Sequence, residues 1–221
     1  MHHFSMTGLR LLIIFLVTVL WSCNSTTTRP VTNYVPSDTT TSFKINGYWV
    51  TPKNFFDFNS LGKSTGDTLH LVTCSQYVYF PFGKLTDRQS LEISSLNNFS
   101  VKEFKRDTFT NLDVSPNLQW SESMDLQLGD NKLRLFFDNN PEGSMHGYIR
   151  GGQIVDDKVA LSEDVRVGMS LETFYSLFFS HFPVELQKKY RVLKFESCVT
   201  DVTHIYTFDS GQLSLVNFVS Q

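Results

Sequence analysis

The side chains best suited to chemistry in this sequence belong to its three cysteines, Cys23, Cys74 and Cys198. Cys74 and Cys198 each fall in a segment with the composition of a β-strand, so they could pair as a disulfide that closes a long loop. Such a bond typically stabilises a fold by about 2–5 kcal/mol. The alternative is that both thiols stay free and pack as small apolar groups.

Two histidines could combine with these cysteines to form a metal site. His70 precedes Cys74 by four residues, which places both on one face of a strand, and His204 follows Cys198 closely. Four such ligands would suit a tetrahedral zinc ion, although the C-x-x-C pairs typical of zinc sites do not occur in the sequence. We therefore expect no resident metal or cofactor, and His70, Cys74, Cys198 and His204 remain the alternative to a disulfide.

An apolar run near the N-terminus gives Cys23 a different role. Residues 11–21 (LLIIFLVTVLW) have the length of a signal-peptide core and fall short of the roughly 18–20 residues that a membrane-spanning helix needs. Residues 20–23 (LWSC) resemble the bacterial lipobox, whose cysteine is diacylated and becomes the new N-terminus. The resemblance implies a signal peptide over residues 1–22, lipidation of Cys23 and a membrane partner reached through the lipid.

The segment after Cys23 predicts a tether and a location. Residues 23–42 are rich in Thr, Ser and Pro and contain few large apolar side chains, which is typical of a flexible linker. Asn24 replaces the aspartate that retains lipoproteins at the inner membrane of enteric bacteria. We expect a protein of the bacterial cell envelope, with the outer membrane favoured and the body facing the periplasm.

Composition predicts a packed domain and excludes one class of partner. The chain has 20 Phe, 8 Tyr and 3 Trp, enough aromatic material for a core. Removing residues 1–22 takes away Arg10 and leaves 18 basic residues against 22 acidic ones, without a cluster of Lys and Arg. Because binding to phosphate backbones needs a basic face, we expect no nucleic-acid partner.

The pattern of elements changes along the chain. Residues 43–155 read as mainly β, with the clearest hairpin over 126–136, where apolar and polar residues alternate around a Gly129 turn. Residues 156–221 predict a helix capped by Ser170 that extends to Phe182, a second helix over 184–190, and strands over 192–199, 204–208 and 212–219. The expected fold class is α+β, with a helix-helix-strand-strand-strand unit and an antiparallel sheet. This unit is either separate or one domain with the preceding region.

Two short motifs connect the C-terminal region to known envelope lipoproteins. Residues 168–174 (GMSLETF) and 206–213 (YTFDSGQL) resemble the helix-opening and hairpin motifs of BamE-like outer-membrane assembly components and of β-lactamase-inhibitor-like repeats. The resemblance covers residues 159–219, about a third of the chain. It implies an α+β unit that takes part in envelope assembly or protein binding.

No residue set in the sequence predicts a catalytic site, so we expect a non-enzymatic protein that binds another protein or supports envelope assembly. The alternative is a periplasmic enzyme or ligand-binding protein that acts on carbohydrate or cell-wall material. Crowded aromatic residues predict the interaction surface. They are Tyr77, Tyr79, Phe80, Phe82 and Phe179.

Overall fold

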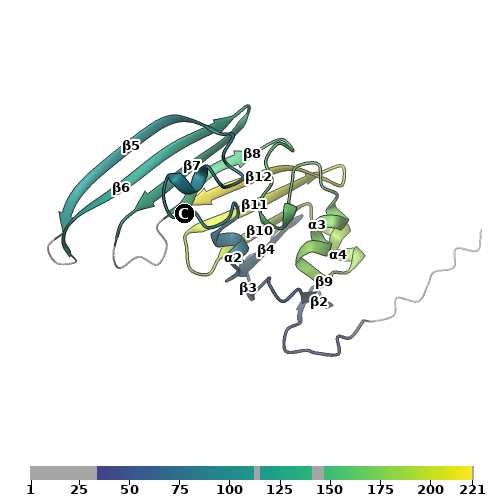
Figure 1. Cartoon of the computed structure of the whole chain (residues 1–221). Helices are drawn as coiled ribbons and strands as arrows, with labels where there is room; N and C mark the ends of the chain where they lie inside the picture. The colour runs from purple at the N-terminus through teal and green to yellow at the C-terminus, as the bar shows by residue number, and fades with distance from the viewer. Residues whose placement is uncertain (1–33, 112–114, 141–146, 221) are drawn as a thin grey trace, which may run out of the picture. The chain divides into compact units, whose positions relative to one another are not determined.

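The computed structural model describes residues 34–111, 115–140 and 147–220, and the described residues from 36 onward form one compact unit. In this unit the described strands form two sheets (Figure 1). The small sheet has the order β1-β2-β9, with bounds Phe43–Ile45, Tyr48–Pro52 and Phe179–His181. Short helical segments are α2 (Gln76–Tyr79), η1 (Gln89–Leu91), η2 (Ser162–Asp164), α3 (Leu171–Phe178) and α4 (Val184–Lys189).

The large sheet has nine strands in the order β3-β4-β10-β11-β12-β8-β7-β6-β5. Their bounds are β3 Phe58–Leu61, β4 Thr68–Thr73, β10 Val192–Ser197, β11 Val202–Asp209, β12 Gln212–Ser220, β8 Gly147–Ile154, β7 Asn131–Asp138, β6 Ser115–Leu128 and β5 Ser100–Asn111. Neighbouring strands are antiparallel except β4 and β10, which are parallel. The sheet therefore joins strands from both halves of the chain.

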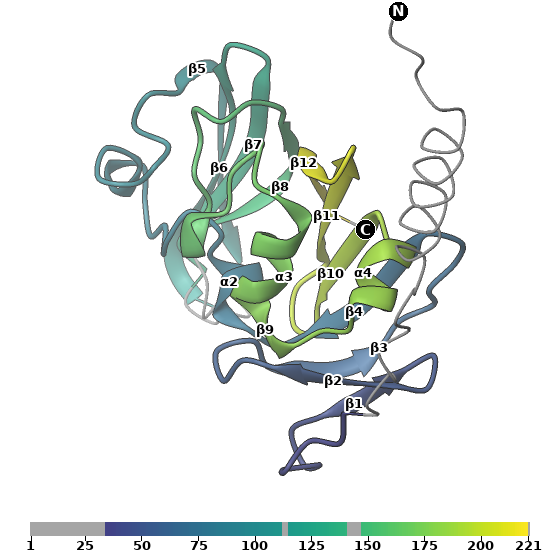
Figure 2. The same ribbon diagram turned by 90° about the vertical axis from the view of Figure 1, so that its right-hand side faces the viewer.

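Strict alternation of apolar and polar residues gives this sheet an inner and an outer face. In β4, Leu69 and Leu71 are buried while His70 between them is half-buried on the other side, and in β7 Leu133, Leu135 and Phe137 are buried. Helices α2, α3 and α4 lie against the inner face (Figure 2). Burial on one face fixes the register, because a slip by one residue would expose every apolar side chain.

Aromatic rings dominate the core between helix α3 and the sheet. The Phe174 ring lies 4.8 Å from Tyr206 and 4.9 Å from Phe178, measured between centroids. Phe178 in turn contacts Phe195 at 5.1 Å, and Phe56 reaches Phe195 at 4.8 Å. These tilted contacts are the geometry that aromatic pairs prefer, and they bind α3, β10 and β11 together.

The predicted α+β class is wrong. Strands account for 48% of the structure and helices for 14%, so the protein is mostly β. The expected helix-helix-strand-strand-strand unit is not a separate sheet. Its strand β10 pairs with β4 and its strand β12 pairs with β8, and β4 and β8 lie outside residues 156–221. Sequence patterns show which segments are strands but not which distant strands they pair with.

Helix α3 is also shorter than predicted. Ser170 caps it as expected, since its side chain accepts a hydrogen bond from the Thr173 backbone N–H at 3.1 Å. The helix ends at Phe178, whose carbonyl accepts a hydrogen bond from the Lys53 backbone N–H at 2.8 Å. The chain then continues as β9, paired with β2, so Phe182 lies beyond the helix. The Lys53 N–H, directly after β2, thus takes the place of the next helical hydrogen-bond donor.

A polar group occupies the inner face beside this aromatic core. His204 is fully buried, its Nδ1 lies 3.0 Å from the Tyr206 hydroxyl, and Tyr206 donates to the Tyr77 hydroxyl at 2.8 Å. Since the Tyr206 proton is committed to Tyr77, Nδ1 of His204 must donate to Tyr206. Burial lowers the pKa of His204 to about 3, so the folded protein keeps this ring neutral.

His204 makes folding sensitive to acid. The unfolded chain takes up a proton near pH 6.5, whereas the folded chain does not until about pH 3. The free energy of unfolding should therefore be unaffected above pH 6.5 and should fall below it by up to ~1.4 kcal/mol per pH unit. We expect His204→Phe to remove this part of the slope in urea titrations between pH 6.5 and 5. Equal slopes for the two proteins would show that His204 is not the group responsible.

Candidate interaction surface

The predicted disulfide between Cys74 and Cys198 is confirmed. The sulfur atoms are bonded at 2.03 Å and the Cα atoms lie 5.1 Å apart. Cys74 directly follows β4 and Cys198 directly follows β10, and the Cys198 N–H donates to the Thr73 carbonyl at 2.9 Å, which continues the parallel ladder by one residue. The bond thus clamps the ends of the two parallel strands together.

The zinc alternative fails for the same four residues. Both thiols are consumed by the disulfide, so neither can act as a thiolate ligand. His70 lies on the outer face and its Nε2 is 2.7 Å from Glu196 Oε2, whereas His204 is buried on the inner face. The sheet itself separates the two rings. Among the described residues, no group of three or more His, Cys, Asp and Glu side chains is placed to hold a metal ion.

The predicted aromatic interaction surface is largely wrong. Tyr77, Phe82 and Phe179 are buried in the core, at 5%, 4% and 3% exposure, while Tyr79 and Phe80 are half-buried. Aromatic crowding along the chain does not distinguish a core from a surface, since both use the same residues. Tyr79 instead lies beside the disulfide, with its hydroxyl 3.2 Å from Cys198 Sγ. The predicted lipidation site, Cys23, lies outside the described residues.

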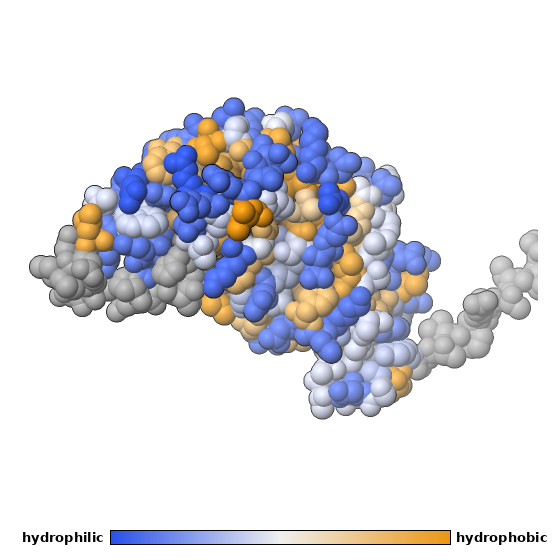
Figure 3. All heavy atoms as spheres, viewed as in Figure 1, coloured by the Kyte–Doolittle hydropathy of each residue, from blue (hydrophilic) through white to orange (hydrophobic). Residues whose placement is uncertain are grey.

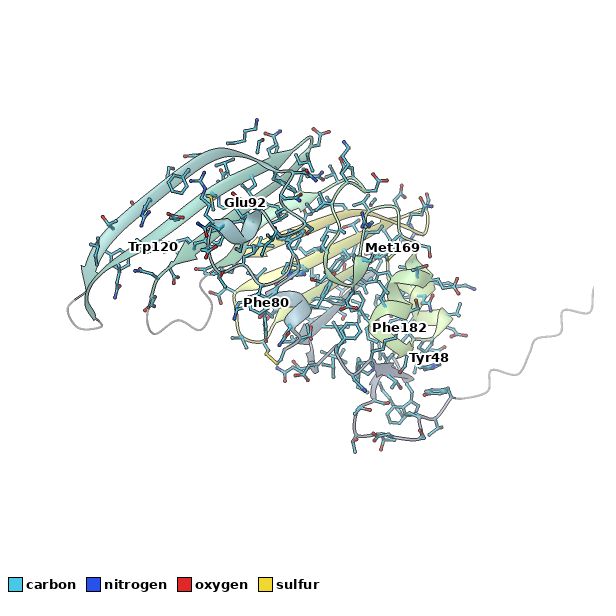
Figure 4. All side chains as sticks on the ribbon, in the orientation of Figure 1. Tyr48, Phe80, Glu92, Trp120, Met169 and Phe182 are labelled. Atoms are coloured by element: carbon cyan, nitrogen blue, oxygen red, sulfur yellow. A yellow bond between two sulfur atoms is a disulfide. The ribbon has the colours of Figure 1, made fainter. Side chains whose placement is uncertain are left out.

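A different surface comes from the unequal lengths of neighbouring strands. Strand β6 has 14 residues and β7 has 8, and their pairing ends at Ser121 opposite Asp138. The rest of β6 continues past β7, and among the described strands it pairs there with β5, with Trp120 opposite Thr108 and Gln119 opposite Phe109. On the β7 side, Asn139 still exchanges hydrogen bonds with the Trp120 backbone. The β5–β6 hairpin therefore projects beyond the sheet, and Trp120 lies on it away from the helices (Figure 4). Hydrophilic and hydrophobic residues are interspersed over this hairpin (Figure 3).

The inner side of this hairpin carries apolar side chains that helices α2, α3 and α4 leave exposed. Leu118 and Trp120 follow the alternation that buries Met124, but Leu118 is 60% exposed and Trp120 half-exposed. On β5, Phe104 lies opposite Met124 on the same side and is 41% exposed. We call Phe104, Arg106, Leu118, Trp120 and Glu122 the hairpin inner patch.

Charged groups hold the aromatic rings of the hairpin inner patch in place. The Arg106 guanidinium lies 5.0 Å from the Trp120 ring centre and 3.3 Å from Glu122 Oε1, and Glu122 is only 7% exposed. Arg88, from the loop before β5, lies 5.3 Å from the Phe104 ring. Stacked Arg and Trp side chains lose little conformational freedom on binding and are enriched among residues that dominate protein interfaces.

The outer side of the same strands is strongly polar. Arg134 forms two hydrogen bonds with Asp125, at 2.7 and 3.0 Å, and Lys105 pairs with Glu103 at 2.8 Å. Hydrogen bonding to Arg134 lowers the pKa of Asp125, and hydrogen bonding to Glu103 raises the pKa of Lys105. Both shifts favour the charged forms, which is the electrostatics of ion pairing and not of proton transfer near neutral pH.

Comparisons with protein-family models, curated proteins and solved structures find no match to this chain. The likeness of residues 159–219 to BamE-like and β-lactamase-inhibitor-like proteins therefore stays a prediction.

The disulfide should make a large contribution to stability because it closes a loop with a sequence separation of 124 residues. We expect the double variant Cys74→Ser/Cys198→Ser to lower the free energy of unfolding by about 2–5 kcal/mol, measured by urea titration without reductant. Cys23→Ser is the matched control and should unfold like the unaltered protein. An unchanged midpoint in the double variant would contradict a stabilising role for the bond.

Proposed function

We propose that this chain is a lipid-anchored protein of the bacterial cell envelope whose folded body binds another protein through the hairpin inner patch. The observation that carries the proposal is the exposure of Leu118 and Phe104, at 60% and 41%, beside a stacked Arg106–Trp120 pair. An apolar centre with Trp and Arg anchors is the composition of protein-binding surfaces. A partner that covers this side would bury the apolar area that the sheet leaves open.

The covalent chemistry of the chain supports an extracytoplasmic location. A disulfide that joins two strands of the sheet suits a compartment outside the reducing cytoplasm. The signal-like run over residues 11–21 and the LWSC motif around Cys23 support export and lipidation, with Asn24 favouring the outer membrane. Within the described part of the chain, no helix is long and apolar enough to cross a membrane.

The anchor is tested by metabolic labelling with a palmitate analogue in a bacterial host. We expect label on the unaltered chain and none on Cys23→Ser, because Cys23 is the acceptor that the motif predicts. Cys198→Ser removes a different cysteine and should keep the label. Labelled Cys23→Ser would refute lipidation at this position.

The interface is tested by photo-crosslinking in cells of the native host, with the reactive amino acid placed at Leu118. We expect a discrete covalent adduct that mass spectrometry identifies as one protein, and its loss when Trp120→Ala is added, since truncating an interface anchor typically costs about 2–4 kcal/mol. Val184 on α4 is 55% exposed and serves as the matched control position. Equal adducts from both positions, or none from Leu118, would contradict the proposed surface.

A further inference from the structure

A second feature lies on the opposite side of the sheet from the hairpin inner patch. On the outer face of β5–β8 there is a hollow of about 380 Å³. Its charged and backbone lining is formed by Lys102, Asp125, Lys132, Arg134, Arg150 and Gly151. We call it the cationic hollow. Its volume falls in the range of sites that hold small ligands.

Two irregularities of the sheet bring basic side chains to the cationic hollow. Between β5 and β6 the register shifts between Val101 and Glu103, so that Lys102 is the extra residue. Between β7 and β8 the register shifts between Arg134 and Leu135, whose partners are Gly151 and Ile149, so that Arg150 is the extra residue. Such bulges redirect a side chain and are frequent at functional sites. Here both redirected residues are cations that line one hollow.

Neighbouring groups orient the two arginines. The Arg150 guanidinium lies 4.1 Å from the Phe136 ring centre, and its Nη2 donates to the Tyr148 hydroxyl at 3.1 Å. Arg134 is held by its two hydrogen bonds to Asp125. Gly151 lies opposite Arg134 in the ladder, and because it has no side chain it leaves the space beside Arg134 open. The guanidinium groups are thus positioned before any ligand arrives.

The charges of the cationic hollow do not balance. It is lined by four basic side chains and one acidic one, and Asp125 is already committed to Arg134. Among the described residues, Lys102, Lys132 and Arg150 have no acidic partner. The adjoining polar hollow shares Asp125, Arg134 and Arg150 and adds Lys105, Glu103 and Asp107, so the two hollows together hold five basic and three acidic side chains. A local excess of positive charge on a chain of net charge −3 is the electrostatic pattern of an anion site.

We propose that the cationic hollow binds a phosphomonoester group. Such a group carries about −1.5 to −2 charges near pH 7 and presents three acceptor oxygens, which matches the three cations without acidic partners. A single carboxylate would neutralise only one of them. The phosphomonoester comes either from a soluble metabolite or from a lipid headgroup. Arg150 supplies a planar pair of donors, and Lys102 and Lys132 supply point charges from neighbouring strands.

The site is tested by calorimetric titration of the full chain in a non-ionic detergent, with sn-glycerol 3-phosphate as the soluble probe and dihexanoyl phosphatidic acid as the lipid probe. We expect saturable binding that weakens as salt is added, because the attraction is between exposed charges. Arg150→Ala and Lys102→Ala should each lower the affinity about tenfold, as expected for one charge-assisted hydrogen bond. Lys188→Ala, on the exposed side of α4, is the matched control and should bind like the unaltered chain.

The two probes separate the possible sources of the phosphate. Equal affinity for both probes, weakened about tenfold in Arg150→Ala, supports a soluble phosphomonoester, and binding of phosphatidic acid alone, weakened to the same extent in that variant, supports a lipid headgroup. Dihexanoyl phosphatidylcholine should not bind, because it lacks the phosphomonoester. Binding of neither probe, or equal binding by the unaltered chain and Arg150→Ala, would overturn the proposal. None of these outcomes depends on the protein partner of the hairpin inner patch.

Discussion

The parallel pairing of β4 with β10 is the interaction on which the rest of the fold depends. It joins β3 and β4 to the β10-β11-β12 meander, although strands β5 to β9 lie between β4 and β10 in sequence. Closing so long a connection costs chain entropy before any contact is gained. The Cys74–Cys198 bond at the ends of the two strands and the packing of Phe56, from the turn before β3, on Phe195 of β10 offset that cost. Helix α3 then has a fixed surface to cover.

Local features of this fold could be predicted from the sequence and distant pairings could not. The Ser170 cap, the β6–β7 turn at Gly129 and the partner of Cys74 each follow from residue type over a short span or from the small number of candidates. The prediction of an α+β class was wrong because the composition of a strand does not show which other strands are its neighbours in the sheet. A meander that looked self-contained is the middle of a larger sheet.

The candidate surface was missed for a related reason. Tyr77 and Phe82 looked like recognition residues because aromatic side chains crowd there, yet the helix-covered face buries them. The exposure of Leu118 follows from a difference in strand length, since β6 outlasts β7. The sequence carries this signal, because the run of alternating apolar and polar residues in β6 is longer than the run in its neighbour β7. Likewise, only the paired register reveals that Lys102 and Arg150 occupy bulges on one face.

The two edges of the large sheet determine whether copies of the chain would pair into longer sheets. An unpaired edge strand is a template for further strands from other copies. At one edge β3 has only 4 residues, and at the other the exposed β5 carries charges on five of the six residues from Lys102 to Asp107. A fully overlapping antiparallel pair of two β5 strands would place Lys105 of each copy against Arg106 of the other, which sets like charges against each other. The β5 edge therefore resists pairing with a second copy, so the projecting β5–β6 hairpin does not act as a template for fibres.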